Sequence, residues 1–318
     1  MKRVIFMFPG QGSQAIGMGK NIYDTYPDIQ TLYERANDVL NKDIMDLMFN
    51  GPDEQLTATE NAQPALLLSS IATSHILEKE GVQPIATIGH SLGEYSALVA
   101  AGVLTLDAAL PLVATRGKLM EDAFPKGQGA MAAVLGLTEE EITACLEKRP
   151  EKEIVDMANI NCPGQIVISG TQKGLESVEP ILLDAGARRV VHLNVSGPFH
   201  SRLMKKASEE FSDYLSNVNF QSADIPVYAN VTAQPVTDSN QIQSLLVEQL
   251  FSPVQFESSI RHMNELDADA FVEVGNGKVL SGLVRKIDRK IKTFSIQDQA
   301  SLNKFLNWYK TSYKKSRE

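Results

Sequence analysis

The sequence predicts an α/β fold in which a parallel-sheet domain carries a small ferredoxin-like subdomain as an insert. Two observations indicate this fold. Strand, turn and helix patterns follow one another in the first third of the chain, which is typical of a parallel sheet covered on both faces. The middle of the chain has the order β-α-β-β-α-β of the ferredoxin-like split unit. We therefore assign residues 1–126 and 197–318 to the large domain and residues 127–196 to the small subdomain.

The first third of the chain contains two expected strands and three expected helices. The apolar run 4–8 is too short for the core of a signal peptide and is expected to be a buried strand. Pro64 is expected in the first turn of a helix, and Pro111 marks a kink or a late start of another. The second strand is expected over 84–89, and the helices are expected over 62–79, 92–101 and 106–122.

The middle of the chain contains residues that mark where helices and strands begin and end. Thr138 with Glu141 three residues later is the pattern of a capping box, which places a helix directly after it. Pro163-Gly164 predicts a turn between two strands, and Gly186 ends the second helix. The expected helices cover 138–148 and 175–185, and the expected strands cover 129–137, 155–161, 165–169 and 188–195.

The amino-acid composition and net charge limit which classes of protein this chain can belong to. The chain has 318 residues, 43% hydrophobic and 22% charged, so it can bury a sizeable core. The formal net charge of −9 argues against nucleic-acid binding, and the basic stretch 307–318 is expected to be a solvated tail. Cys145 and Cys162 match no disulfide or metal pattern, and no apolar stretch approaches ~20 residues. We expect a cytoplasmic monomer that binds neither metal nor membrane.

The most informative segment is Gly89-x-Ser91-x-Gly93, which lies between an expected strand and an expected helix. A serine at such a turn adopts a strained backbone, so small residues are needed two positions to either side. The turn presents the hydroxyl above the positive end of the following helix, and the N–H of Leu92 points where an oxyanion would form. The pattern alone is weak, but its flanks match the required context. We therefore predict that Ser91 is a nucleophile.

A serine hydroxyl needs a base to take its proton. The chain has five histidines, and His200 is the candidate, because it lies in the tight loop Val195-Ser-Gly-Pro-Phe-His200 and follows Ser91 in the chain order of hydrolases. No aspartate or glutamate stands out as a third member. Structural roles are expected for two of the others and a solvated position for a third, namely His75, His192 and His262. The strand-to-helix reversal is expected to point His90 away from Ser91, toward packing or a local hydrogen bond.

Eight motifs in one chain order resemble the stand-alone malonyl-CoA:acyl carrier protein transacylases of bacterial fatty acid synthesis. The resemblance covers nearly the whole chain, and the order of the motifs makes it specific. The motifs are Phe8-Pro-Gly-Gln-Gly-Ser-Gln14, Asn61-Ala-Gln-Pro-Ala-Leu66, Gly89-His-Ser-Leu-Gly-Glu-Tyr-Ser-Ala97, Arg116-Gly-Lys118, Asn161-Cys-Pro-Gly-Gln-Ile-Val-Ile-Ser-Gly170, Ser196-Gly-Pro-Phe-His200, Glu248-Gln-Leu-Phe-Ser-Pro-Val254 and Glu273-Val-Gly-Asn-Gly-Lys-Val-Leu-Ser-Gly282.

The resemblance implies a hydrolase-like α/β domain with a ferredoxin-like insert, and it implies roles for particular residues. Ser91 is the nucleophile, His200 is the general base, and the backbone carbonyl of Gln249 orients the imidazole. The N–H groups of Gln11 and Leu92 form the oxyanion hole. A dyad of this kind explains why no acidic partner stands out, and no metal or redox cofactor is implied.

The resemblance also implies residues that contact the substrate. Arg116 pairs with the free malonyl carboxylate, for which a guanidinium is suited because it offers two parallel donors and stays charged when buried. Phe199 resembles the bulky residue that accompanies malonyl use in related polyketide acyltransferases, and Asn159 and Asn161 line the cleft. One departure is Asn276, where the family commonly has proline. Because asparagine tolerates unusual turns, we expect little functional change there.

The implied reaction moves malonyl from malonyl-CoA to the phosphopantetheine thiol of acyl carrier protein through an ester on Ser91. Three alternatives stay open, namely an acyl hydrolase or thioesterase, a malonyl transacylase of a polyketide pathway, and a non-catalytic module that docks carrier protein. Because carrier proteins are generally acidic, this acidic chain needs a local basic patch. The candidates are Lys205, Lys206, Arg285, Lys286 and Arg289.

Overall fold

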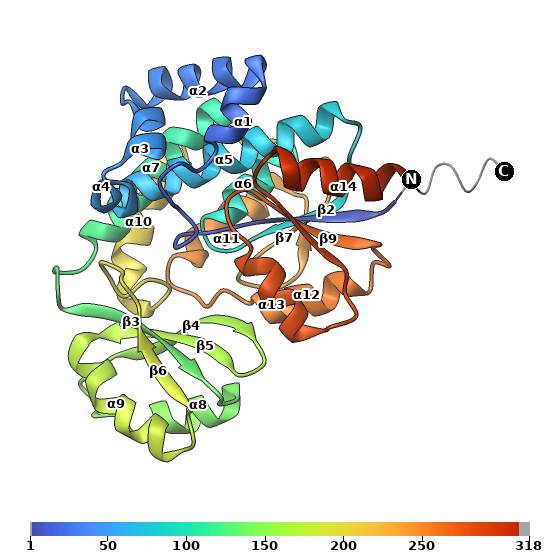
Figure 1. The fold of residues 1–318 in the computed structure, drawn as a ribbon. Helices are drawn as coiled ribbons and strands as arrows, with labels where there is room; N and C mark the ends of the chain where they lie inside the picture. The colour runs from blue at the N-terminus through green and yellow to red at the C-terminus, as the bar shows by residue number, and fades with distance from the viewer. Residues whose placement is uncertain (1, 312–318) are drawn as a thin grey trace.

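The computed structural model describes residues 2–311, which form two β-sheets with helices packed around them (Figure 1). The larger sheet has six strands in the order β10-β9-β1-β2-β7-β8. Its first five strands run parallel, and only β8 runs antiparallel to its neighbour β7. The strands are β1 (Val4–Phe8), β2 (Pro84–Gly89), β7 (Val227–Tyr228), β8 (Pro235–Val236), β9 (Ala270–Val274) and β10 (Thr293–Ile296).

Helices of the large domain lie on both faces of this sheet. In Figure 1, α5 and α14 lie on one side, and α12 and α13 lie on the other. The helices are α1 (Lys20–Thr25), α2 (Pro27–Leu40), α3 (Ile44–Asn50), α4 (Asp53–Thr57), α5 (Thr59–Lys79), α6 (Gly93–Ala100), α7 (Leu106–Asp122), the short 3-10 helix η1 (Arg202–Met204), α10 (Lys205–Leu215), α11 (Ser239–Gln249), α12 (Phe256–Asn264), α13 (Val279–Ile287) and α14 (Gln299–Thr311).

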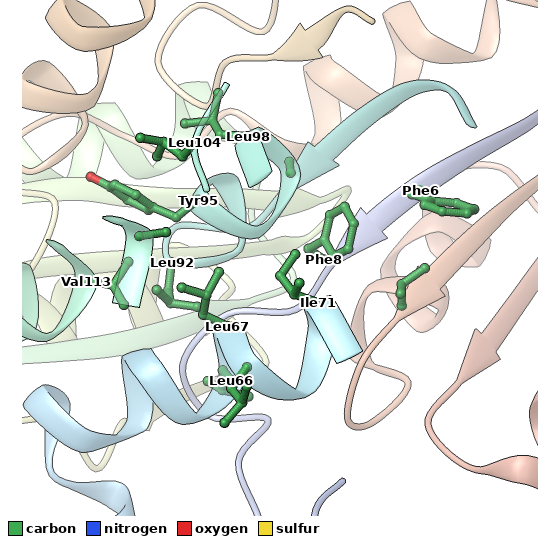
Figure 2. Close-up of a cluster of buried hydrophobic side chains, with 14 of the residues drawn as sticks. Phe6, Phe8, Leu66, Leu67, Ile71, Leu92, Tyr95, Leu98, Leu104 and Val113 are labelled. Atoms are coloured by element: carbon green, nitrogen blue, oxygen red, sulfur yellow. The ribbon is translucent and has the colours of Figure 1, made fainter. Parts of the chain in front are cut away.

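The alternation of side chains along β1 explains why both faces are covered. Phe6 and Phe8 belong to the larger buried cluster with α5, α6 and α7, part of which is drawn in Figure 2. Ile5 and Met7 point to the opposite face and pack with α12 and α13. All five residues of β1 are buried, which is the pattern of a central parallel strand. The apolar run at the start of the chain is therefore a core strand, as predicted.

The smaller sheet confirms the predicted ferredoxin-like unit. Its four strands are antiparallel in the order β4-β5-β3-β6, with α8 and α9 packed against them. The capping box of Thr138 and Glu141 is present at the start of α8. The elements are β3 (Gly129–Leu135), α8 (Glu139–Leu146), β4 (Val155–Cys162), β5 (Gln165–Thr171), α9 (Gln172–Asp184) and β6 (Arg189–His192). The domain boundaries at 126/127 and 196/197 stay predictions.

The two sheets are joined near the predicted cleft. Asn159 of β4 forms an isolated parallel bridge with Val254, with Val254 N donating to Ala158 O at 2.8 Å. Lys286 of α13 donates to Gln165 Oε1 of β5 at 3.1 Å. These contacts hold the small sheet against the C-terminal half of the large domain.

Some element boundaries differ from the sequence-based expectations. Helix α5 begins three residues earlier than expected, so Pro64 lies inside it, beyond the first turn, and Pro111 lies within α7 without ending it. Strand β6 ends at His192 rather than at residue 195. The stretch 307–318 was expected to be a solvated tail, but α14 continues to Thr311, because its face buries Phe305 and Tyr309. The remainder of that stretch lies outside the described residues.

The junction between β2 and α6 packs backbone against backbone. A Cβ at Gly89 would lie 1.8 Å from the carbonyl carbon of Gly93, and a Cβ at Gly93 would lie 2.0 Å from Phe8 O. Neither neighbour is a side chain that can rotate away. The two glycines of the Gly-x-Ser-x-Gly pattern are therefore required by the close packing of the backbone.

We expect Gly89→Ala to destabilise the fold by about 1–3 kcal/mol, because the added methyl group forces a backbone shift at the end of β2. Gly282→Ala is the matched control, since a Cβ there would meet no neighbour within 4 Å among residues 2–311 and alanine favours the helix. Denaturant unfolding compares the three proteins. An unchanged unfolding midpoint for Gly89→Ala would contradict this account of the junction.

Candidate active site

Ser91 lies at the turn between β2 and α6 in a left-handed conformation, with φ of 51°. A non-glycine residue in this region carries strain, so surrounding contacts must hold it there. Asn230 supplies two of them, because its Oδ1 accepts from Ser91 N at 2.8 Å and its Nδ2 donates to Gly89 O at 2.7 Å. The predicted strand-to-helix turn is thus present and braced from outside its own segment.

His200 reaches Ser91 from a loop 109 residues further along the chain. Its Nε2 lies 2.8 Å from Ser91 Oγ, and its Nδ1 lies 2.8 Å from the backbone oxygen of Gln249. His200 also has a positive φ, 57°, and its N–H donates to Leu250 O at 3.1 Å. The structure therefore brings together the two side chains on which the sequence-based mechanism depends.

The hydrogen bonds of His200 determine which nitrogen can act as a base. Gln249 O can only accept, so we infer that Nδ1 carries the proton of the neutral ring. Nε2 then has a free lone pair facing the hydroxyl of Ser91. A backbone carbonyl thus holds the imidazole as an acidic side chain does in a triad, which accounts for the missing third member.

The electrostatic environment keeps His200 neutral. Burial lowers the pKa of His200 from 6.5 to about 3, and the positive charge of Arg116 adds to the effect. Burial also lowers the pKa of the neighbouring His90. Near neutral pH both imidazoles are uncharged, which is the state that general-base catalysis by His200 requires.

Arg116 is fully buried beside Ser91. Its Nη2 donates to Ser91 Oγ at 3.1 Å and to Gln249 Oε1 at 2.8 Å, and its Nη1 donates to Gln63 Oε1 at 2.9 Å. Its Nε has no hydrogen-bond partner among residues 2–311. The guanidinium is held by neutral amides and keeps a free donor. An anionic group bound next to Ser91 would meet an available positive charge.

A cavity of about 450 Å³ opens over Ser91 and His200. The large domain contributes Gln11 and Met120 to its lining, and the small sheet contributes Met131 and Asn159. Phe199, which is 4% exposed, completes the wall beside His200. The lining combines apolar side chains with convergent polar groups that include Gln14, Asp53 and Thr57, a mixture that suits a small-molecule site.

Two further residues were predicted to belong to the site, namely Leu92 and Asn161. Leu92 directly precedes α6, so its N–H lies at the N-terminal end of that helix, beside Ser91. Asn161 is not among the residues that line the cavity; its Oδ1 is 2.7 Å from His90 Nε2. Asn161 therefore contacts the site through His90, which itself lines the cavity. The hydrogen bond of His90 joins residues 71 positions apart, so it is not the local bond within the turn that was one of the expectations.

The remaining histidines have local partners. His75 pairs with Asp28 at 3.1 Å, and His192 pairs with Glu179 at 2.8 Å. His262 was expected to be solvated, but it is half-buried and its Nδ1 lies 2.8 Å from Ala233 O. None of the three lies in the cavity over Ser91.

Sequence reasoning missed three residues that hold the site. Gln63 and Glu94 stand inside quoted motifs, and Asn230 stands in none. The signal at Glu94 is a carboxylate in the otherwise apolar first turns of α6, where it is 3% exposed. Asn230 gives no local signal, because its contacts are all with residues distant in the chain.

Asn276 makes a contact that proline cannot make. Its Nδ2 donates to Ser13 O at 2.6 Å, which ties the turn after β9 to the loop that carries Gln11. The substitution relative to the usual family pattern thus adds a side-chain hydrogen bond to that loop.

Comparisons with known proteins agree with this geometry. The acyl transferase domain family matches residues 5–299. A malonyl CoA-acyl carrier protein transacylase of Bacillus subtilis strain 168 is 47% identical over 303 residues, 95% of this chain and 96% of that protein. A malonyl CoA-acyl carrier protein transacylase of Clostridium perfringens superposes with a TM-score of 0.96 at 36% identity, over 99% of this chain and 100% of that one. A malonyl-transacylase solved in complex with its type II PKS acyl-carrier protein superposes with a TM-score of 0.94 at 37% identity, over 96% and 99% of the two chains.

We expect the rate at which a fluorophosphonate probe labels Ser91 to stay constant from about pH 7.5 to about pH 5. The neutral imidazole of His200 is the reactive form, and its lowered pKa means that it is lost only as the pH falls well below 6.5. Circular dichroism at each pH checks that the protein stays folded.

Arg116→Met is the informative companion variant in this experiment. Removal of the positive charge raises the pKa of His200, so the acid limb should move to higher pH. A wild-type labelling rate that halves between about pH 6 and about pH 7 would contradict the assignment, because it would indicate an unperturbed histidine.

Proposed function

The chain belongs to the acyl transferase family and within it to the malonyl CoA-acyl carrier protein transacylases, and we propose that it works through a malonyl ester on Ser91. It transfers the malonyl group of malonyl-CoA to acyl carrier protein. The observation that carries the proposal is the contact of Ser91 Oγ with both His200 Nε2, at 2.8 Å, and Arg116 Nη2, at 3.1 Å. One hydroxyl oxygen thus has a base and a carboxylate-binding group beside it.

In the first half-reaction, Ser91 Oγ attacks the thioester carbonyl while His200 Nε2 takes its proton. The negative charge on the carbonyl oxygen is stabilised by the N–H groups of Gln11 and Leu92. When the tetrahedral intermediate collapses, the carbon–sulfur bond breaks and His200 returns the proton to the sulfur of coenzyme A. The phosphopantetheine thiol of the carrier protein then reverses these steps and removes malonyl from Ser91.

The position of Arg116 fits the length of the malonyl group. Only one methylene separates the carbonyl that Ser91 attacks from the free carboxylate, so the carboxylate must bind close to Ser91 Oγ. The buried guanidinium lies next to Ser91 Oγ, and its Nε donor is unpaired as far as the structure describes the chain. This arrangement favours acyl transfer of a dicarboxylic substrate over general acyl hydrolysis, which needs no such group.

We propose fatty acid synthesis as the pathway, because the motifs resemble the stand-alone enzymes of that pathway. The complex of a related malonyl-transacylase with a type II PKS carrier keeps polyketide synthesis as the alternative. Of residues 2–311, no helix is long and apolar enough to cross a membrane. A cytoplasmic location is part of the proposal. The basic side chains offered above for carrier docking, Lys205, Lys206, Arg285, Lys286 and Arg289, are all exposed.

We expect intact-mass analysis to find one malonyl group on the wild-type protein after exposure to malonyl-CoA, and none on Ser91→Ala. Addition of carrier protein should remove the label from the wild type. Ser96→Ala is the matched control, since Ser96 lies on the adjacent helix and its buried Oγ has no hydrogen-bond partner within the described part of the chain. A malonyl-labelled Ser91→Ala protein would refute the covalent route.

We expect Arg116→Ala to lower the ratio of malonyl to acetyl transfer by about 10- to 100-fold, which is the contribution of one or two hydrogen bonds to a charged group. Acetyl transfer should fall less, because acetyl has no carboxylate to bind. Lys118→Ala, an exposed cation on the same helix, should leave the ratio unchanged. If the ratio in Arg116→Ala equals that of the wild type, Arg116 does not bind the carboxylate.

A further inference from the structure

Behind Ser91 lies a fully buried polar network that the reaction itself does not use. Glu94, Asn230 and Gln249 are 3%, 0% and 0% exposed, and they come from α6, the loop after β7 and the end of α11. Burial of a carboxyl group is costly unless its oxygens are hydrogen-bonded. Packing alone therefore does not explain why a carboxyl group is buried at this position.

The hub of this network is the side-chain amide of Gln249. Its Nε2 donates to Glu94 Oε2 at 2.6 Å, and the oxygens Ser91 O and Asn230 Oδ1 each lie 3.2 Å from it. Its Oε1 accepts from Arg116 Nη2 at 2.8 Å. Donor and acceptor ends of the amide thus face opposite kinds of partner.

The direction of this amide decides what Arg116 meets. If the amide were reversed, its NH₂ group would face the guanidinium, and donor would meet donor. Glu94 prevents the reversal because a carboxyl oxygen accepts where the Gln249 oxygen would otherwise lie. Burial raises the pKa of Glu94 to about 7, but a protonated carboxyl group still has one oxygen that accepts. The orientation therefore holds in both protonation states.

We propose that Glu94 is a specificity-positioning residue that fixes the direction of the Gln249 amide and thereby aims Arg116 at the free carboxylate of the substrate. This inference rests on the proposed transfer of malonyl through Ser91. Neither Glu94 nor the Gln249 side chain touches the reacting atoms. They set the position of the group that distinguishes an acidic acyl chain from a neutral one.

Glu94 makes a second hydrogen bond, and the effect of losing it must be distinguished from the proposed role. Glu94 Oε2 also accepts from Asn230 N at 3.1 Å, and Asn230 braces the turn at Ser91. Loss of Glu94 therefore disturbs the nucleophile as well. Damage to the turn slows malonyl and acetyl transfer alike, whereas misdirection of Arg116 slows malonyl transfer selectively. The ratio of the two rates isolates the proposed role.

The experiment measures acylation of Ser91 from malonyl-CoA and from acetyl-CoA, separately, by intact mass. We expect Glu94→Leu to lower the malonyl-to-acetyl ratio about tenfold, the contribution of one hydrogen bond to a charged group. Glu94→Gln keeps an oxygen acceptor for the Gln249 amide and should restore the ratio to within about twofold of the wild type. Asn230→Ala should slow acylation from both substrates, because Asn230 braces the turn at Ser91.

A matched control and a second variant separate the proposed effect on selectivity from a loss of stability. Glu273 is also fully buried and accepts from two backbone N–H groups, those of Leu280 and Ser281, so Glu273→Leu should cost stability without changing the ratio. If Glu94→Leu does not fold, Gln249→Leu tests the same relay, since it retains the backbone carbonyl that holds His200, and its ratio should fall likewise.

Equal loss of both rates in Glu94→Leu, or an unchanged ratio in Gln249→Leu, would overturn the proposal and leave Glu94 with a structural role only. Failure of the proposed function would look different, because the wild-type protein itself would then carry no malonyl group on Ser91.

Discussion

The hydrogen bond between Ser91 and His200 sets the conditions that the surrounding structure meets. Both residues have a left-handed backbone, with φ of 51° and 57°, and each such residue costs of order 1–3 kcal/mol. The strain is held by contacts from outside the two loops, chiefly Asn230 at Ser91 and Gln249 and Leu250 at His200. The close backbone packing of Gly89 on Gly93 has the same purpose, because it leaves the turn no room to relax.

The buried positive charge of Arg116 acts on His200, the proposed base, and in the proposed function it would also act on the substrate. Its Coulomb effect lowers the pKa of His200, so in the free protein the imidazole is neutral but weakly basic. A carboxylate paired with Arg116 would cancel much of that effect and raise the pKa of His200. In the proposed mechanism, the base would thus become stronger when an acidic acyl chain is bound. Selectivity for a dicarboxylic substrate would then operate in the chemical step as well as in binding.

The sequence allowed the local features of the site to be predicted, and the distant ones only in part. Ser91 was found because its turn, its glycines and its flanking elements are adjacent in the chain. The dyad partner His200 was supported mainly by its loop and by the resemblance. Glu94 and Gln249 are 155 residues apart, and no periodicity or spacing indicates that their side chains meet. The start of α5 was misplaced for a related reason, since tertiary packing overrode the usual position of proline at Pro64.

The two sheets contribute different kinds of residue to the cavity over Ser91 and His200. Ser91 and His200 come from the large domain, and Arg116 of the same domain is buried beside Ser91 without lining the cavity itself. The small sheet contributes Met131 and Asn159, and the segment after it contributes Leu193, Asn194 and Val195. A thioester substrate enters with its acyl group attached to a long thiol arm. The arm must then leave while the acyl group stays bound to the protein. Under the proposed function, the polar groups beside Ser91 would hold the acyl group, and the opposite wall would offer the departing arm no charged partner, because the lining residues from that part of the described chain are all uncharged.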